Sequence, residues 1–315
     1  MKYPIIDLHC DLLLYLAADR RRTPIDPASR CSVPQLQEGG VSSQVFAIYT
    51  DTKKGSTTVG ERQFQLLSAI KGVNVLASIE NGSVIAEEDE PLEAGLKRLG
   101  SFIQRKGKFA YLSLTWNDEN RFGGGNNSNN VGLKADGKIL LEKLAELNIP
   151  VDLSHTSDKL AEGILNYIDA AKLNLPVLAS HSNSRSVCNH LRNLPDEIAQ
   201  EIFKRGGVIG LNFVMHIVGG NTFEDIYRHY AHFKKWGGED KVCFGADFFS
   251  SDDLPESLKK LHTEWFPAAW PNSSCYPHLL KDWINKEYIS KETAQKLANE
   301  NARRFFLEKT QITDI

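Results

Sequence analysis

The chain has 315 residues, of which 41% are hydrophobic, and a formal net charge of -3 at pH 7. This length is enough to bury a large core, and an α/β barrel absorbs it as one domain. Because no stretch is strongly basic, nucleic acid is not expected as a partner. No run reaches the roughly 20 apolar residues that a membrane helix needs, so no membrane association is expected.

The chain ends and the cysteines bear on the compartment. Residues 1–4 lack the order of charged, apolar and small residues that marks a signal peptide, and residues 311–315 carry no hydrophobic tail. The five cysteines are widely spaced and include no C-x-x-C pair, which is typical of reduced thiols in the cytosol. We therefore expect a cytoplasmic protein.

Eight short apolar runs alternate with helical patterns along the chain. The runs predict buried strands, because they are rich in Val, Ile, Leu, Phe and Tyr and stop at polar or glycine residues. They cover residues 4–11, 43–51, 73–81, 109–117, 150–156, 176–183, 207–213 and 242–249. Helical periodicity is found over residues 61–71, 91–105, 136–147, 157–171, 195–204, 222–235, 277–286 and 291–308.

This order of elements predicts the fold. Strand and helix in repeated alternation favour parallel strands joined by crossover helices. Eight such units favour a closed (β/α)8 TIM barrel, with an open doubly wound sheet as the alternative. The absence of a G-x-G-x-x-G or Walker A motif counts against a nucleotide-binding sheet. No linker divides the chain, so residues 1–315 are expected to form one barrel domain.

Three segments stand outside this regular pattern. The connections over residues 12–42 and 250–276 are long, as in functional lids or rims of barrels. The glycine run 123–125 lies in the Asn-rich stretch 117–130, and we interpret it as a flexible surface loop rather than a phosphate cradle.

The first predicted strand ends in a histidine and an aspartate two residues apart, His9 and Asp11. Because side chains alternate along a strand, these two share one face, and the other face carries Ile6, Leu8 and Cys10. An imidazole beside a carboxylate at a strand end suits a metal ion. Cys10 is expected to point away from that ion.

Polar side chains also end the other predicted strands, and the active site of such a barrel lies where its strands end. The residues at this rim are His9, Asp11, Tyr49, Asp51, Glu80, Trp116, Asn117, His155, His181, Asn212 and Asp247. Imidazole with carboxylate suits Zn, Mn, Fe or Ni better than Mg or Ca. The set is large enough for two ions about 3.5–4 Å apart if one carboxylate bridges them. Singly, each histidine could be a hydrogen-bonded core residue, but their joint placement favours metal.

Seven motifs follow one another along the chain. They are D-x-H-x-D at 7–11, L-x-E-G-G-V-x-x-Q-x-F at 36–46, I-E-N-G at 79–82, V-D-x-S-H at 151–155, P-V-x-x-S-H-S at 176–182, R-N-x-x-D at 192–196 and G-x-D at 245–247. In this order they resemble the membrane dipeptidase (renal dipeptidase) family of zinc peptidases, in a soluble form like the bacterial members.

The resemblance implies a barrel of the metal-dependent hydrolase type that binds two Zn²⁺ ions. The ligands of the first ion match His9, Asp11 and Glu80, and those of the second match Glu80, His155 and His181, so that Glu80 bridges. A hydroxide bridging the ions is the implied nucleophile. The implied substrates are dipeptides, including those with a D-residue at the C-terminal position.

The resemblance also implies roles around the metals. Asp247 contacts the substrate and moves protons, so Asp247 and Glu80 are the candidate catalytic residues. Arg192 holds the terminal carboxylate, a task that suits a guanidinium able to form two parallel hydrogen bonds. Trp116 and Asn117 match the strand end that contacts the substrate. The best-known members have a histidine at the position of Trp116, whose indole donates one N–H but cannot take a proton.

Two other functions compete with a dipeptidase. One is a related amidohydrolase that acts on N-acyl amino acids or lactams. The other is a metal-binding protein that has lost catalysis, for which Trp116 is the only support. Members of the family are often dimers, so a homodimer is an expected assembly besides the small peptide substrate.

Overall fold

The computed structural model describes residues 3–254, 259, 264–310 and 312–315. Within them, eight parallel strands form one sheet in the order β6-β5-β4-β3-β2-β1-β8-β7. They are β1 (Ile5–Cys10), β2 (Val41–Tyr49), β3 (Asn74–Glu80), β4 (Leu112–Ser113), β5 (Val151–Asp152), β6 (Val177–Leu178), β7 (Ile209–Leu211) and β8 (Val242–Phe244).

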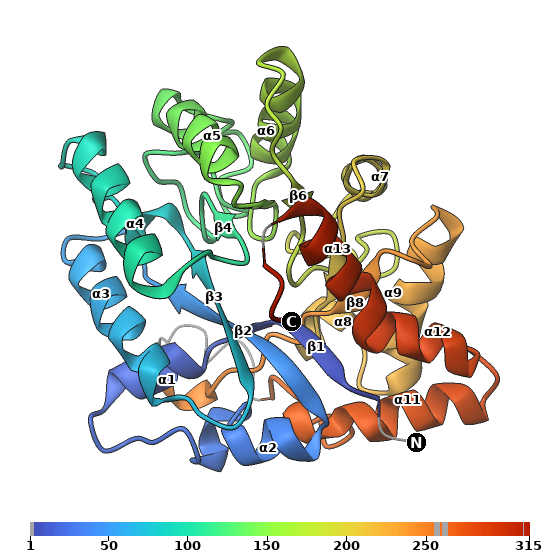
Figure 1. Ribbon diagram of the computed structural model, residues 1–315. Helices are drawn as coiled ribbons and strands as arrows, with labels where there is room; N and C mark the ends of the chain where they lie inside the picture. The colour runs from blue at the N-terminus through green and yellow to red at the C-terminus, as the bar shows by residue number, and fades with distance from the viewer. Residues whose placement is uncertain (1–2, 255–258, 260–263, 311) are drawn as a thin grey trace.

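The two edges of this sheet meet. A parallel bridge joins Ala179, just after β6, to Ile209 in β7. There the backbone N–H of Gly210 donates to the carbonyl of Ala179 at 2.8 Å. The strands therefore form the predicted (β/α)8 barrel and not the open sheet, with the helices around them (Figure 1).

Helices fill the connections between the strands. Between consecutive strands lie α3 (Ser56–Leu66), α4 (Leu92–Lys106), α5 (Ala135–Leu147), α6 (Asp158–Ala170), α7 (Asp196–Lys204) and the pair α8 (Met215–Val218) and α9 (Phe223–Lys235). The long first connection contains α1 (Leu12–Ala18) and α2 (Val33–Glu38), and the chain ends with α11 (Tyr276–Asn285), α12 (Lys291–Gln295) and α13 (Asn301–Lys309). A π-helical turn over Lys296–Glu300 joins the last two, within the single helix predicted over 291–308.

Helix α3 begins five residues before its predicted start at residue 61. A side chain distant in sequence, Glu87, caps it: the backbone N–H of Gly55 donates to Glu87 Oε1 at 3.0 Å and the Thr57 hydroxyl at 2.8 Å. Gly55 has a φ of 87°, which glycine adopts without strain. Because this cap comes from another part of the fold, local sequence gave no sign of it.

The ladders of β4 to β8 are shorter than the predicted runs. In the residues that follow β5 and β6, backbone N–H groups donate to a buried carboxylate instead of to a neighbouring strand. Asp152 Oδ1 accepts the N–H groups of Ser154 at 3.0 Å and Ser180 at 2.8 Å. These segments stay buried and hydrogen-bonded without strand pairing, which satisfies the requirement on buried backbone groups.

The interpretation of residues 123–125 as a flexible surface loop is wrong. All three glycines are buried, and Gly125 forms an antiparallel bridge with Thr156. A Cβ on Gly125 would lie 1.9 Å from the carbonyl oxygen of Trp116, so only glycine fits. Asn126 N–H donates to the His155 carbonyl at 2.9 Å. This segment therefore packs against the ends of β4 and β5.

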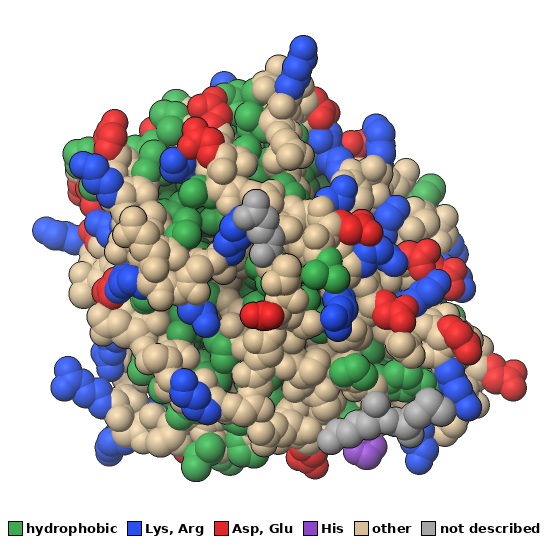
Figure 2. Space-filling view, in the orientation of Figure 1, with side chains coloured by type: hydrophobic (Ala, Val, Ile, Leu, Met, Phe, Trp, Pro, Cys, Tyr) green, Lys and Arg blue, Asp and Glu red, His purple; other side chains and the backbone are tan. Residues whose placement is uncertain are grey.

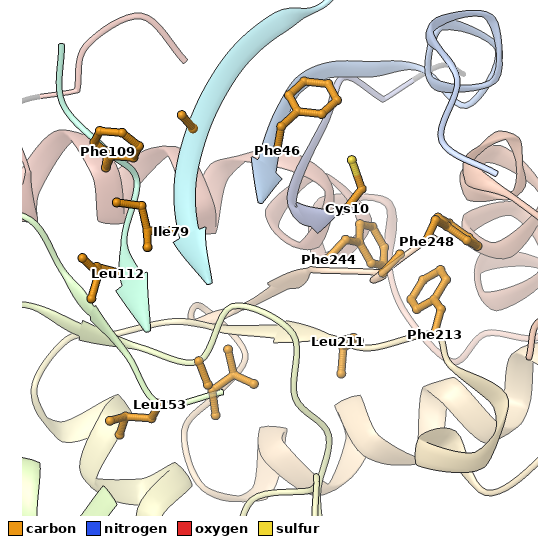
Figure 3. Close-up of a cluster of buried hydrophobic side chains, with 14 of the residues drawn as sticks. Cys10, Phe46, Ile79, Phe109, Leu112, Leu153, Leu211, Phe213, Phe244 and Phe248 are labelled. Atoms are coloured by element: carbon orange, nitrogen blue, oxygen red, sulfur yellow. The ribbon is translucent and has the colours of Figure 1, made fainter. Parts of the chain in front are cut away.

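The core has two layers. The outer layer lies between strands and helices, and Figure 3 shows Phe46, Ile79, Leu112 and Phe244 contributing to it from four strands. The inner layer fills the barrel and includes Ile6, Leu8, Val45, Tyr111, Phe305 and Phe306. Phe305 and Phe306 belong to α13. This helix lies across the end of the barrel at which the strands begin, near the C-terminus (Figure 1). Charges of both signs are scattered over this face (Figure 2).

The structure also bears on three further features of the sequence: membrane-spanning helices, the cysteines and the long connection over residues 250–276. Among the described residues, no helix combines the length and apolarity needed to cross a membrane. All five cysteines are free thiols. The long connection 250–276 lies partly outside the described residues; in its described part, Trp270 is buried and its indole N–H donates to the Phe213 carbonyl at 2.7 Å.

Candidate metal centre

Two candidate ligands, His9 and Asp11, lie at the end of β1, where the pairing with β2 is irregular. Asp7 pairs with Gln44, but Cys10 pairs with Phe46, so β1 carries one extra residue. His9 and Asp11 still reach one cluster, as predicted. The prediction for the opposite face is wrong in part: Leu8 packs in the inner layer and Cys10 in the outer one, because the extra residue breaks the alternation.

Glu80, the last residue of β3, lies among three imidazoles. Its Oε1 is 2.9 Å from His155 Nε2 and 3.5 Å from His181 Nε2. Its Oε2 is 3.4 Å from His9 Nε2. One carboxylate thus faces the histidines of β1, β5 and β6 with different oxygens, which is the arrangement a bridging ligand requires.

Hydrogen bonds on the outer side of the rings fix two of the histidines. The Ser180 hydroxyl donates to Asp152 at 2.7 Å, so its oxygen accepts the Nδ1–H of His181 at 2.6 Å. His155 Nδ1 lies 2.7 Å from Asn117 Oδ1, which can only accept. Both Nδ1 atoms therefore carry the proton, and both Nε2 atoms, 2.9 Å apart, turn their lone pairs toward Glu80.

His9 is fixed in the same way from across the barrel. Its Nδ1 lies 2.7 Å from the hydroxyl of Tyr111. Its Nε2 is buried and makes no hydrogen bond to any described residue. Around this atom, at 3.4–3.9 Å, lie carboxylate oxygens of Glu80, Asp247 and Asp11. A buried nitrogen with no partner among three acids marks a position for a cation.

The charges of the cluster agree with this. Burial disfavours the protonated form of His9, but the carboxylates around it, Glu80 first, outweigh burial and raise its pKa to about 10. Burial lowers the pKa of His155 to about 3, with Arg192 adding to the effect. The pKa of His181 is also well below its usual value, chiefly through burial. The neutral imidazoles of His155 and His181, next to a surplus of negative charge that also attracts a proton to His9, suit a divalent cation with N and O ligands.

Among the residues that the structure describes, three overlapping groups have ligand atoms within 4.8 Å of one another. They are His9, Asp11 and Glu80; Glu80, His155 and His181; and His9, His181 and Asp247. Glu80 belongs to two of them, so the side chains present fit two metal ions that share a carboxylate. Burial raises the pKa of Asp247 to about 6, which leaves that group able to hold or release a proton near neutral pH.

Beside the cluster lies a buried guanidinium. Arg192 is 7% exposed, and its Nη2 donates to the carbonyl of His181 at 3.2 Å. Asn212, after β7, donates to the same carbonyl at 3.2 Å and to Asp247 Oδ2 at 2.8 Å. Sequence placed Asn212 at the rim without a role; the structure makes it the link that orients Asp247.

Trp116 lies next to a candidate ligand, and Tyr49 lies next to Trp116. The Trp116 ring lies 5.8 Å from that of His155 and 5.0 Å from that of Tyr49. Asp51 instead pairs with Lys53 at 2.7 Å and with the Tyr49 hydroxyl at 2.6 Å. Asp51 therefore does not join the acid cluster. Asn117, predicted to contact substrate, directs its side-chain oxygen to His155.

Two residues of the site hold an unusual backbone conformation. His155 has a φ of 67° and Asp247 a φ of 63°, in the left-handed region that non-glycine residues seldom adopt. Such a residue costs on the order of 1–3 kcal/mol and persists only where the surroundings impose it. The surrounding hydrogen bonds here include that from Asp247 N–H to the His9 carbonyl at 3.2 Å.

Two buried aspartates that sequence reasoning passed over hold the ligand segments. Asp7 accepts the His9 N–H at 2.8 Å and the amide of Gln44 at 3.1 Å. Asp152 plays the same part before His155 through the bonds to Ser154 and Ser180 described above. The signal was in the motifs, since each aspartate precedes its histidine by two or three residues.

A family model described as membrane dipeptidase (Peptidase family M19) matches residues 62–314. The chain belongs to this family. Among curated relatives, Dipeptidase 3 of Mus musculus is 24% identical over 341 aligned positions, which include 99% of this chain and 66% of the relative. The chain thus spans just under two thirds of that relative's length.

Solved structures support the fold. A metallopeptidase from Rhodobacter sphaeroides, liganded with a phosphinate mimic of the dipeptide L-Ala-D-Ala, is 21% identical, with a TM-score of 0.80 over 98% of this chain and 100% of that one. An amidohydrolase from Pseudomonas aeruginosa is 16% identical, with a TM-score of 0.71 over 96% of both chains. At these identities the likeness concerns the barrel architecture.

Proposed function

We propose that this protein is a metal-dependent dipeptidase that binds two Zn²⁺ ions. The observation that carries the proposal is the convergence of three imidazole Nε2 atoms on the two oxygens of Glu80. His9, Asp11 and Glu80 would hold one ion, and Glu80, His155 and His181 the other. When bound, such ions polarise the scissile carbonyl and bring the pKa of a water into the neutral range.

The neighbouring residues supply the rest of the reaction. Arg192 is buried beside the cluster and suits the C-terminal carboxylate of a dipeptide, because a guanidinium binds a carboxylate with two parallel hydrogen bonds. Asp247, oriented by Asn212, would carry a proton to the leaving amine; its raised pKa of about 6 supports this role. Trp116 would form the wall of the site next to His155.

Dipeptides with a D-residue at the C-terminal position belong to the proposed substrate class. The support is the Rhodobacter sphaeroides neighbour, which was solved with a mimic of L-Ala-D-Ala. For this chain, activity on these dipeptides is part of the proposal and rests on the family resemblance.

Glu80→Gln tests the proposal. Gln keeps the shape of the side chain but offers one oxygen in place of a bridging carboxylate. We expect two zinc ions per wild-type chain and one or none in the variant, with kcat/KM lowered more than about 100-fold, since loss of an outer partner of a ligand already costs about 10–100-fold.

The substrate panel contains L,L- and L,D-dipeptides, N-acyl amino acids and lactams, with metal content measured on each sample. As a matched control, Glu93→Gln changes a glutamate in the first turn of α4 and should leave metal content and turnover unchanged. Wild-type turnover by the Glu80 variant with fewer than two ions would refute the proposal. Turnover confined to N-acyl amino acids or lactams would assign the second activity instead.

A further inference from the structure

Tyr111 lies in the interior of the barrel, one residue before β4, and has no part in the reaction proposed above. It is fully buried in the inner layer of the core. Its ring lies nearly parallel to the imidazole of His9, with centroids 6.4 Å apart and 19° between the planes. A buried tyrosine hydroxyl needs hydrogen-bond partners, and two of those found here, His9 and the Leu8 carbonyl, belong to β1. The side chains of Ser78 and Ser180 also interact with this hydroxyl.

The direction of these hydrogen bonds follows from their chemistry. The carbonyl oxygen of Leu8, 2.8 Å away, can only accept, so the Tyr111 hydroxyl donates to it. The hydroxyl oxygen then accepts from His9 Nδ1 at 2.7 Å.

We propose that Tyr111 is a positioning residue that presents His9 as an Nε2 ligand and sets the affinity of the ion bound by His9, Asp11 and Glu80. The inference rests on the proposed two-metal site. It is specific to one ion, because His155 and His181 have outer partners of their own in Asn117 and Ser180. Without the Tyr111 oxygen, the Nδ1–H of His9 has no acceptor among the residues that the structure describes, and the ring loses its fixed orientation.

The test is a zinc titration of the metal-free protein in competition with a chromophoric chelator. We expect Tyr111→Phe to weaken one of the two ions about 10- to 100-fold and leave the other at wild-type affinity, as is typical when an outer partner of a metal-binding histidine is removed. Ser180→Ala should weaken the other ion by a similar factor. The double variant should then bind both ions weakly.

Tyr230→Phe is the matched control. Tyr230 is also buried, and its hydroxyl makes no hydrogen bond to any residue that the structure describes. Its loss should leave both zinc affinities unchanged.

Three outcomes would overturn the inference. In the first, Tyr111→Phe binds both ions as tightly as wild type. In the second, it weakens both equally and lowers the Tm of the metal-free protein, which would indicate a purely structural role. In the third, the double variant keeps one ion at wild-type affinity. If wild type itself binds fewer than two ions, the proposed function fails as well, so the two failures are distinguishable.

Discussion

The guanidinium of Arg192 and the backbone carbonyl of His181 are joined by a hydrogen bond of 3.2 Å. Arg192, which is proposed to bind the substrate, is thus hydrogen-bonded directly to a proposed metal ligand. This bond fixes the position of the substrate carboxylate relative to the metal ions. A lysine could preserve the charge of Arg192 but not its planar fork of donors.

Arg192→Lys is expected to lower kcat/KM for dipeptides about 10- to 150-fold. This range corresponds to about 1.5–3 kcal/mol for hydrogen bonds to a charged group. The measurement is steady-state kinetics on a dipeptide and on its C-terminal amide. Because the amide lacks the carboxylate, it should be hydrolysed equally slowly by both enzymes; an equal loss on both substrates would contradict the assignment.

Trp116→Phe tests whether the indole N–H takes part in catalysis. Phenylalanine keeps an aromatic ring next to His155 but removes the donor. We expect kcat to fall about 100-fold with little change in KM, which is the usual effect of losing one donor to the transition state. Trp116→His restores a donor and should recover most of the rate. If Trp116→Phe keeps the wild-type kcat, Trp116 is only a wall of the pocket.

His229 in α9 should contribute to acid sensitivity. It is buried, accepts the Ser184 N–H at 3.1 Å and lies 2.9 Å from the Val218 carbonyl. Burial lowers its pKa to about 4. Because the folded pKa lies below the unfolded value of about 6.5, its contribution is fully present above pH 6.5 and is lost as the pH falls through 4. The loss amounts to about 3 kcal/mol.

The measurement is urea unfolding of metal-free wild type and His229→Gln at pH 7 and at pH 4.5. Wild type should be the more stable at pH 7, and the difference in free energy of unfolding should shrink at pH 4.5. A difference that stays constant with pH would show that His229 is not the titrating group.

The barrel could be predicted from the sequence because each strand and helix leaves its own pattern of apolar residues in a short segment. The apolar runs and amphipathic periodicities arise from burial along single elements, and eight repeats left few topologies. The predicted start of α3 failed because its cap, Glu87, comes from a later segment. The glycines at 123–125 were misread because only packing against Trp116 reveals why no side chain fits there.

At the site, the sequence by itself determined which residues gather at the rim, because parallel strands in a barrel end at the same face. Thus His9, Glu80, His155 and His181 could be named from strand ends and motifs. Only the tertiary structure decided which nitrogen of each ring faces inward. That choice depends on an acceptor from another strand or loop, such as Tyr111, brought to His9 across 102 residues of chain by closure of the barrel.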